Sequence, residues 1–225
     1  MDVSLTNQGK EDRPDSATGH SGTHGDAPKA KAGKEWTRLV VFASGNGSNA
    51  DRLMQHFKGH PTARVVLLVC NKPNAPVLSV AARHKVPSLV VGPMSWQQGQ
   101  DLVDQLRSFQ ADALVLAGFL WKIPGYLLQA FPDRIVNLHP ALLPDFGGKG
   151  MYGMQVHQAV LASGRHESGI TVHLVNEEYD RGRHLARFVC PVLPEDQPQD
   201  LAKRVQALEH RHYPEVLEAW IGDWA

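Results

Sequence analysis

Short apolar runs alternate with helical stretches along most of the chain. Three of these runs are continuously apolar, at residues 39–43, 65–70 and 113–117. This is typical of parallel strands that are covered on both faces. Other strand-like runs lie at residues 87–91, 134–138, 169–175 and 188–192, and helix candidates at residues 49–57, 76–84, 96–109 and 124–129. The order predicts an α/β fold, a single domain with a doubly wound, mostly parallel sheet.

The two ends of the chain have different patterns. Residues 1–36 are rich in Gly, Ser, His, Lys and Asp and have almost no large apolar side chains, which predicts a disordered N-terminal tail before a domain at residues 37–225. His20 and His24 lie in this polar stretch without a clustered Cys/His pattern, which favours a solvated tail over a metal site. Residues 198–220 have helical spacing, and Pro214 is expected to kink or split that helix.

Composition narrows the possible partners and the compartment. The 23 basic and 23 acidic residues cancel, so no general field favours nucleic acid or an anionic membrane. Cys70 and Cys190 both lie beside apolar residues, as buried thiols do in a reducing compartment. The start of the chain lacks the pattern of a secretion signal, and no run of about 18 apolar residues occurs. We therefore expect a cytoplasmic location.

A glycine-containing loop follows the first strand. Gly45, Asn46, Gly47, Ser48 and Asn49 lead into a helix, where backbone N–H groups and the helix dipole favour a phosphate. A dinucleotide site would also need an acidic residue about 20 positions further on, and the chain has Cys70, Asn71 and Lys72 there instead. A tight turn capped by Ser48 is the alternative, and the loop by itself does not decide between them.

Two polar side chains mark the end of the strand predicted near residue 135. Asn137 and His139 lie two residues apart and therefore share a face, with α-carbons roughly 6.6 Å apart, and Pro140 ends the strand. An Asn amide can hold a carbonyl oxygen, and a His can donate a proton to the oxyanion that forms there. No Ser or Cys adjoins the pair, which favours direct attack by a substrate amine. The alternative is a pair that only satisfies loop backbone groups.

Asp180 lies in a polar loop after the next predicted strand. A carboxylate beside a catalytic His could orient the ring, favour its charged form or accept a proton. An acidic residue so close to Gly182 is also a common turn former. The local sequence does not separate the two interpretations.

Five motifs in order along residues 38–220 resemble phosphoribosylglycinamide formyltransferases. They are residues 44–49, 116–119, 137–144, 169–173 and 179–182. The resemblance implies a Rossmann-like formyltransferase fold, with transfer of a formyl group from 10-formyltetrahydrofolate, as co-substrate, to the amine of glycinamide ribonucleotide. Residues 119–124 and 146–153 resemble a bacterial branch of that family.

The resemblance also implies residue roles. Asn137, His139 and Asp180 match the catalytic group, in which His139 and Asn137 stabilise an oxyanion and Asp180 assists proton transfer through His139 or water. The residues that match the ribonucleotide site are Asn46, Gly47, Ser48, Asn49 and Glu209. The residues that match the folate pocket are Leu120, Trp121, Lys122, Ile123, Glu178 and Tyr179, together with Asn137 and Asp180.

Several positions depart from the family pattern. Charged residues follow the Asp180 turn, at Arg181, Arg183, His184 and Arg187, where they either alter the folate loop or mark the outer face of an edge strand. Trp121 and Lys122 replace the arginine and aliphatic pair common in relatives, and residues 94–100 contain no match for a folate-contacting arginine. These changes concern folate affinity rather than the chemistry.

Other functions remain as alternatives. Methionyl-tRNA formyltransferase and formyltetrahydrofolate deformylase share the catalytic group, but the first normally has a C-terminal RNA-binding barrel and the second an N-terminal regulatory domain. A non-catalytic nucleotide-binding module would use only the glycine loop and leave His139 dispensable. No metal site is expected, because His157, His166 and His173 are dispersed. We expect a monomer or a homodimer.

Overall fold

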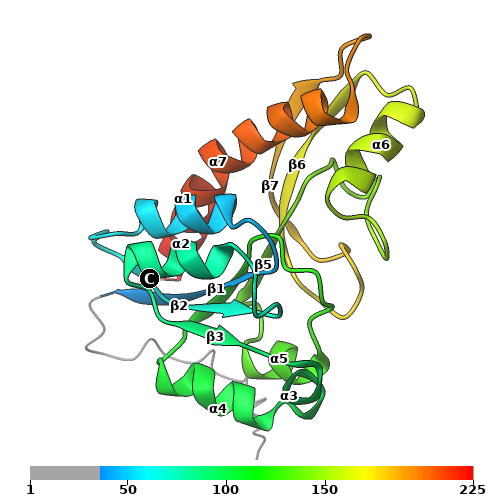
Figure 1. Cartoon of the computed structure of the whole chain (residues 1–225). Coiled ribbons are helices and arrows are strands. Elements are labelled where there is room, and N and C mark those ends of the chain that lie inside the picture. The colour runs from blue at the N-terminus through cyan, green and yellow to red at the C-terminus, as the bar shows by residue number, and fades with distance from the viewer. Residues whose placement is uncertain (1–35, 225) are drawn as a thin grey trace, which may run out of the picture. The chain divides into compact units, whose positions relative to one another are not determined.

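The computed structural model describes residues 36–224, and the expected tail at residues 1–36 lies outside them except for Trp36. Within this range the chain forms a seven-stranded sheet in the order β3-β2-β1-β4-β5-β6-β7 (Figure 1). The strands are β1 (Thr37–Ala43), β2 (Ala63–Cys70), β3 (Ser88–Val90), β4 (Ala113–Leu116), β5 (Ile135–His139), β6 (Glu167–Leu174) and β7 (His184–Pro191). The helices are α1 (Ser48–His56), α2 (Val77–His84), α3 (Pro93–Gln98), α4 (Gln100–Ser108), α5 (Gly125–Ala130), α6 (Met154–Ala162) and α7 (Pro198–Gly222).

The sheet is mostly parallel, as predicted. Strands β1 to β5 pair in parallel, whereas β6 pairs antiparallel with both β5 and β7. The strand order reverses at β1, which has β2 on one side and β4 on the other. Ligands of open α/β sheets bind beyond the carboxyl ends of the strands at such a reversal. The topology therefore directs attention to the loops that follow β1, β4 and β5.

The continuously apolar strands are explained by two cores, one on each face of the sheet. In β1, Leu39 and Val41 pack into the core under α1, α2 and α7, while Val40 and Phe42 pack into the core over α3, α4 and α5. Figure 1 shows these two sets of helices on opposite faces. All four side chains are at most 1% exposed. In a central parallel strand that is buried on both faces, apolar and polar residues are not expected to alternate.

One predicted helix proves to be two. The helix expected at residues 96–109 begins earlier, at Pro93, and breaks at Gly99, where α3 ends and α4 begins. Gly99 has φ +76°, and a β-carbon there would lie 2.6 Å from the Tyr126 ring. Both the backbone conformation and the close contact require glycine at this position. The helical periodicity alone did not show this break.

Two further helices differ from expectation. Helix α6 was not predicted; it follows a glycine-rich stretch, and only Val156, His157 and Val160 of it are buried. Helix α7 runs continuously through Pro214, so the proline does not split it. Tyr213, Pro214 and Leu217 are all buried, and this packing holds the helix together where an exposed helix would lose stability.

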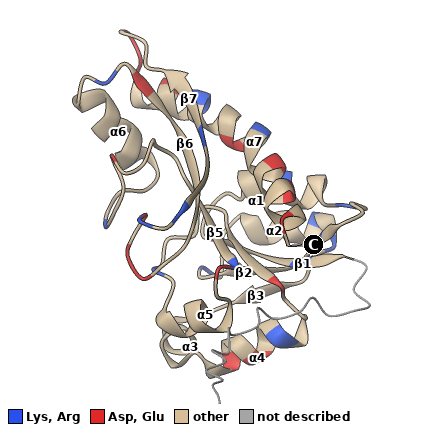
Figure 2. Cartoon of the chain, turned by 180° about the vertical axis from the view of Figure 1, so that it is seen from behind, with Lys and Arg blue, Asp and Glu red and all other residues tan. Residues whose placement is uncertain are grey.

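The cysteines and the helices of residues 36–224 bear on the expected compartment and on membrane spanning. Cys70 and Cys190 are buried free thiols, as predicted. None of the helices in this range has the length and the apolar composition that crossing a bilayer requires. Acidic and basic side chains are interspersed along α7 rather than gathered by sign (Figure 2).

Candidate active site

A cavity of about 810 Å³ lies at the carboxyl ends of the central strands. Its wall is formed by the loops after β1, β4 and β5, the segment before α6, the loop between β6 and β7, and one side of α7. This is the place that the strand reversal indicates, and the volume is within the usual range for small-molecule sites.

Asn137 and His139 both line the cavity, as their shared face on β5 predicts. His139 is only 3% exposed, and its Nε2 lies 2.8 Å from the carbonyl oxygen of Phe146. A carbonyl can only accept, so Nε2 carries the proton of the neutral ring. Nδ1 therefore has the free lone pair and can take up a proton.

Asp180 lies beside that free nitrogen. Its Oδ2 is 3.7 Å from His139 Nδ1 and accepts a 2.8 Å hydrogen bond from the backbone N–H of Gly148. The residue has φ +55°, so it also forms the turn that its sequence context suggested. The two interpretations of Asp180 are therefore compatible: the turn conformation brings the carboxylate to the imidazole.

Burial and charge set the protonation of this pair. Burial lowers the pKa of His139 below its ordinary value, although the charge of Asp180 and the Phe146 carbonyl oppose that effect. Burial raises the pKa of Asp180, but the neighbouring imidazoles of His173 and His139 and the Gly148 N–H outweigh it, so this pKa is lowered. At neutral pH the arrangement thus favours a carboxylate beside a neutral imidazole that is ready to accept a proton.

A third side chain, His173, completes the group and was given no role from the sequence. Its Nδ1 donates to the Leu174 carbonyl at 2.8 Å, so its Nε2 in the neutral ring can accept from the Asn137 amide at 3.1 Å. The same Nε2 is 3.5 Å from Asp180. His173 pairs with Asn137 across the β5–β6 ladder, and an alternating polar residue on β6 was the available signal. His173 thus orients the Asn137 amide, and the second N–H of that amide stays available for a ligand.

The glycine loop is only partly in the cavity wall. Gly45, Asn46 and Asn49 line the cavity, whereas its lining does not include Gly47 or Ser48. Gly47 is the N-cap of α1 with φ +80°, and Ser48 Oγ accepts a 3.2 Å hydrogen bond from Gln206 in α7. The side of the loop formed by Gly47 and Ser48 thus fixes α1 against its neighbours.

Replacement of Gly47 by Ala should destabilise the fold. A β-carbon at Gly47 would meet Val77 Cγ2 at 2.5 Å, and φ +80° is unfavourable for alanine. We expect a loss of about 2 to 4 kcal/mol in the free energy of unfolding, measured by urea denaturation. The matched control is Gly45→Ala, since a β-carbon at Gly45 meets nothing within 4 Å. Equal stability of the two variants would contradict this account of the loop.

Where α1 and α7 meet in the cavity wall, a hydrogen bond joins the two helices. Asn49 Nδ2 donates to Glu209 Oε2 at 2.8 Å, while Asn49 Oδ1 is buried and has no hydrogen-bond partner within residues 36–224. Burial raises the pKa of Glu209, and the hydrogen bond from Asn49 opposes the shift. Lys72, which follows β2, also lines this cavity and was not predicted to do so. A cation directly after a central strand was the signal for it.

The residues matched to the folate pocket line another part of the cavity. Leu120, Trp121, Lys122 and Ile123 line the cavity, and so do Glu178 and Tyr179 from the loop after β6. Lys122 Nζ lies 5.4 Å from the centre of the Tyr179 ring, which links the two segments. The wall also contains residues that sequence reasoning missed, among them Lys149, Tyr152 and His157. All three come from the segment before α6 or from α6 itself, which was not predicted.

The charged residues after Asp180 lie outside this wall. Arg181, Arg183, His184 and Arg187 are all exposed, and none of them lines the cavity. His184 and Arg187 belong to β7, which is the edge strand of the sheet. Of the two interpretations of these departures, the geometry favours the outer face of an edge strand.

Comparisons with known proteins agree with this geometry. The family model described as formyl transferase matches residues 37–217. The chloroplastic phosphoribosylglycinamide formyltransferase of Arabidopsis thaliana is 47% identical over 81% of this chain and 64% of its own length. The phosphoribosylglycinamide formyltransferase of Bacillus subtilis is 35% identical over 82% of this chain and 95% of its own length. The chain thus spans less than two thirds of the plant relative and nearly all of the bacterial one.

Solved structures show the same similarity. Glycinamide ribonucleotide transformylase 1 from Symbiobacterium toebii has a TM-score of 0.77 and 31% identity, covering 84% of this chain and 89% of that one. The corresponding enzyme from Geobacillus kaustophilus has a TM-score of 0.76 and 37% identity, covering 83% and 99%. The fold is therefore the Rossmann-like formyltransferase fold, and the chain belongs to the formyl transferase family, with phosphoribosylglycinamide formyltransferases among its relatives.

Proposed function

We propose that this chain transfers a formyl group from 10-formyltetrahydrofolate to the amine of glycinamide ribonucleotide, in purine synthesis. The products are formylglycinamide ribonucleotide and tetrahydrofolate. The observation that carries the proposal is the convergence of Asn137, His139 and Asp180 in one cavity, between a glycine loop and a partly apolar wall. This group can hold a carbonyl oxygen and move a proton without a covalent enzyme intermediate.

The chemistry follows from the protonation states of the site. The substrate amine attacks the formyl carbon, and the carbonyl π electrons move to oxygen, where the free N–H of Asn137 stabilises the oxyanion. The ammonium group formed by the attack loses its proton to His139 Nδ1, directly or through water, and Asp180 stabilises the resulting imidazolium. That charged ring then gives its proton to the oxyanion, which becomes a hydroxyl. The carbonyl forms again as the bond from the formyl carbon to folate N10 breaks, and the hydroxyl proton passes to N10, directly or through water.

The ribonucleotide is assigned to the side of the cavity formed by the glycine loop. The residues proposed to contact it are Asn46, Gly47, Ser48, Asn49 and Glu209, with Gly47 and Ser48 acting through the first turn of α1, where backbone N–H groups have no helical partner. Lys72 supplies a positive charge to the same side. The free Oδ1 of Asn49 and the buried carboxyl of Glu209 suit the amine-bearing end of the substrate.

The folate is assigned to the part of the cavity lined by residues 120–123 and by the loop after β6. Leu120 and Tyr179 are 43% and 42% exposed, so part of each large side chain is accessible to a ligand. The Trp121 ring packs against the Trp96 ring in a tilted arrangement with centroids 5.5 Å apart, which supports residues 120–123. We propose that Leu120, Trp121, Lys122, Ile123, Glu178 and Tyr179 hold the co-substrate so that its formyl group reaches Asn137 and Asp180.

Glu209→Gln tests the ribonucleotide side. The substitution removes the carboxylate proposed to bind the amine-bearing end, so KM for glycinamide ribonucleotide should rise by about 10-fold or more while KM for the folate stays the same. Steady-state kinetics with each substrate varied in turn gives both values. A rise in the folate KM alone would contradict the assignment of the two sides.

The proposed activity is tested by the release of tetrahydrofolate from 10-formyltetrahydrofolate. The account expects release that depends on glycinamide ribonucleotide. Release at the same rate without the amine would identify a deformylase, and tight nucleotide binding without any release would identify a binding module.

We also infer the setting of the enzyme. Residues 37–225 form the catalytic unit, an extent supported by the family match to residues 37–217. The two buried free thiols support a reducing compartment, which we take to be the cytoplasm, although several plant relatives are named chloroplastic. The bacterial-branch resemblance and the monomer or homodimer state stay predictions, as does the absence of a nucleic-acid partner.

A further inference from the structure

Helices α1 and α7 run side by side, and their contacts continue well beyond the cavity. Near the start of α1, Asn49 contacts Glu209, and at its end His56 contacts Glu218. His60, which follows α1, also reaches Glu218. At the end of this helix pair that lies farther from the cavity, two imidazoles and one carboxylate therefore lie close together. His56 and Glu218 are 162 positions apart in the sequence.

The spacing of these three groups matches a metal site. His56 Nε2 lies 3.2 Å from Glu218 Oε2, His60 Nε2 lies 3.3 Å from Glu218 Oε1, and the ligand atoms all lie within 4.8 Å of one another. Tetrahedral zinc with bonds of about 2.0 to 2.2 Å separates its ligand atoms by about 3.3 to 3.6 Å. Each imidazole thus lies at about this spacing from one of the two Glu218 oxygens. Two His and one Glu are also a known ligand set for zinc.

The surroundings suit metal binding as well. The Thr62 backbone N–H donates to His60 Nδ1 at 3.4 Å, and Thr62 Oγ1 lies 3.2 Å from the same nitrogen, so these contacts hold the ring with its Nε2 toward Glu218. The His56 and His60 rings are stacked with centroids 5.4 Å apart. The side chains are 31%, 13% and 47% exposed for His56, His60 and Glu218, so an ion can reach them from solvent.

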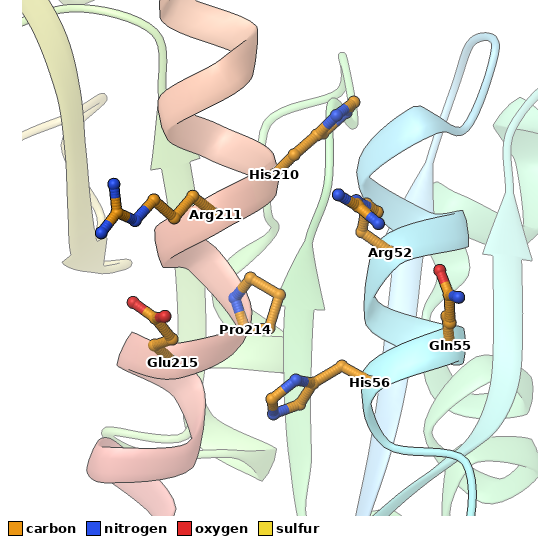
Figure 3. A pocket seen from close by; sticks show the side chains of 7 residues that line it. All are labelled: Arg52, Gln55, His56, His210, Arg211, Pro214 and Glu215. Atoms are coloured by element: carbon orange, nitrogen blue, oxygen red, sulfur yellow. The ribbon is translucent and has the colours of Figure 1, made fainter.

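A second pocket adjoins this cluster. It has a cavity volume of about 390 Å³ and is lined by Arg52, Gln55, His56, His210, Arg211, Pro214 and Glu215. Figure 3 shows His56 projecting from α1 toward α7, and His210 projecting from α7 toward α1. His56 thus belongs to both the pocket and the cluster. A zinc ion with three protein ligands keeps a position for water or another small ligand.

We propose that His56, His60 and Glu218 bind a divalent transition metal of the zinc class, which ties the end of α1 to α7. This goes beyond the proposed formyl transfer and does not depend on it. The ion serves the structure rather than the reaction, since the catalytic group lies at the carboxyl end of β5 and uses other residues. Without metal, one carboxylate shared by two imidazoles forms only partly exposed polar contacts, which contribute little to stability.

The test is a Zn²⁺ titration of the full chain, followed by calorimetry, with His20→Ala and His24→Ala in every sample so that the N-terminal histidines do not compete. We expect one ion per chain. Zn²⁺ at 100 times its Kd should raise Tm by about 5 to 10 °C. Co²⁺ in place of Zn²⁺ should show the visible absorption of a low-symmetry, four-coordinate site.

Ligand variants decide whether the ion binds at this cluster. His60→Ala and Glu218→Gln should each weaken Zn²⁺ binding by at least about 10-fold. Glu215→Gln, the same change one turn earlier on α7, should leave the affinity unchanged, because Glu215 contacts His212 instead. The proposal is overturned if Glu218→Gln binds Zn²⁺ as tightly as its parent, or if Zn²⁺ leaves the Tm of the parent unchanged.

Discussion

His139→Asn is expected to lower kcat for formyl transfer by about 10²- to 10⁴-fold, the range for loss of a general acid–base group. The variant loses the Nδ1 atom that can accept the proton of the attacking amine, 3.7 Å from Asp180. Because the ring is almost fully buried in the wall, the effect on KM for either substrate should be much smaller. Steady-state kinetics with both substrates saturating measures the change.

The matched control for His139 is His166→Asn. His166 is exposed and lies between α6 and β6, away from the cavity lining. Its replacement should leave kcat within about twofold of the parent, since surface changes away from a site have small effects. If His139→Asn retained the parent rate, the assignment of proton transfer to this ring would be wrong, and another group or water would have to accept the proton of the amine.

Asp180→Asn is expected to lower kcat by about 10²- to 10⁴-fold and to shift its pH dependence. The pKa of His139 is lowered by burial, so the reaction should need pH above that depressed value and lose rate as pH falls through it. The negative charge of Asp180 opposes the lowering. Removing this charge should therefore move the acidic limb of kcat/KM to still lower pH, even as the rate at the plateau falls.

A pH–rate profile of the parent and the Asp180→Asn variant gives both effects. Asp104→Asn serves as control, because Asp104 lies on the exposed surface of α4 and pairs only with neighbours on that helix among the contacts in residues 36–224. An acidic limb that moves to higher pH in Asp180→Asn would show that the carboxylate does not favour the charged form of His139.

The sheet and the centre of the site could be predicted from the sequence because their signals are local. Continuous apolar runs identified the central strands, and the two-residue period of a strand placed Asn137 and His139 on one face. The local sequence suggested the turn at Asp180, which has φ +55°, but it did not show that the carboxylate approaches His139, because the Gly148 N–H that holds it comes from a distant segment. The family resemblance, rather than the residues of that loop, indicated its role.

The features that the sequence did not predict depend on tertiary contacts. Gly99 ends a helix because Tyr126 packs on it, and α7 continues through Pro214 because its neighbours are buried. His173 entered the site through its pairing with Asn137 on the adjacent strand. The candidate metal ligands could not be found by spacing, because His56 and Glu218 are 162 positions apart and meet only when α1 packs on α7.

The most direct test of the central claim follows the formyl carbon itself. In a single turnover with enzyme in excess, 10-formyltetrahydrofolate that carries ¹³C in its formyl group is mixed with glycinamide ribonucleotide, and the labelled products are identified by mass spectrometry. Direct attack by the amine predicts that the label appears in formylglycinamide ribonucleotide, in equal amount to the tetrahydrofolate formed. Label released as free formate, with the ribonucleotide unchanged, would contradict the account.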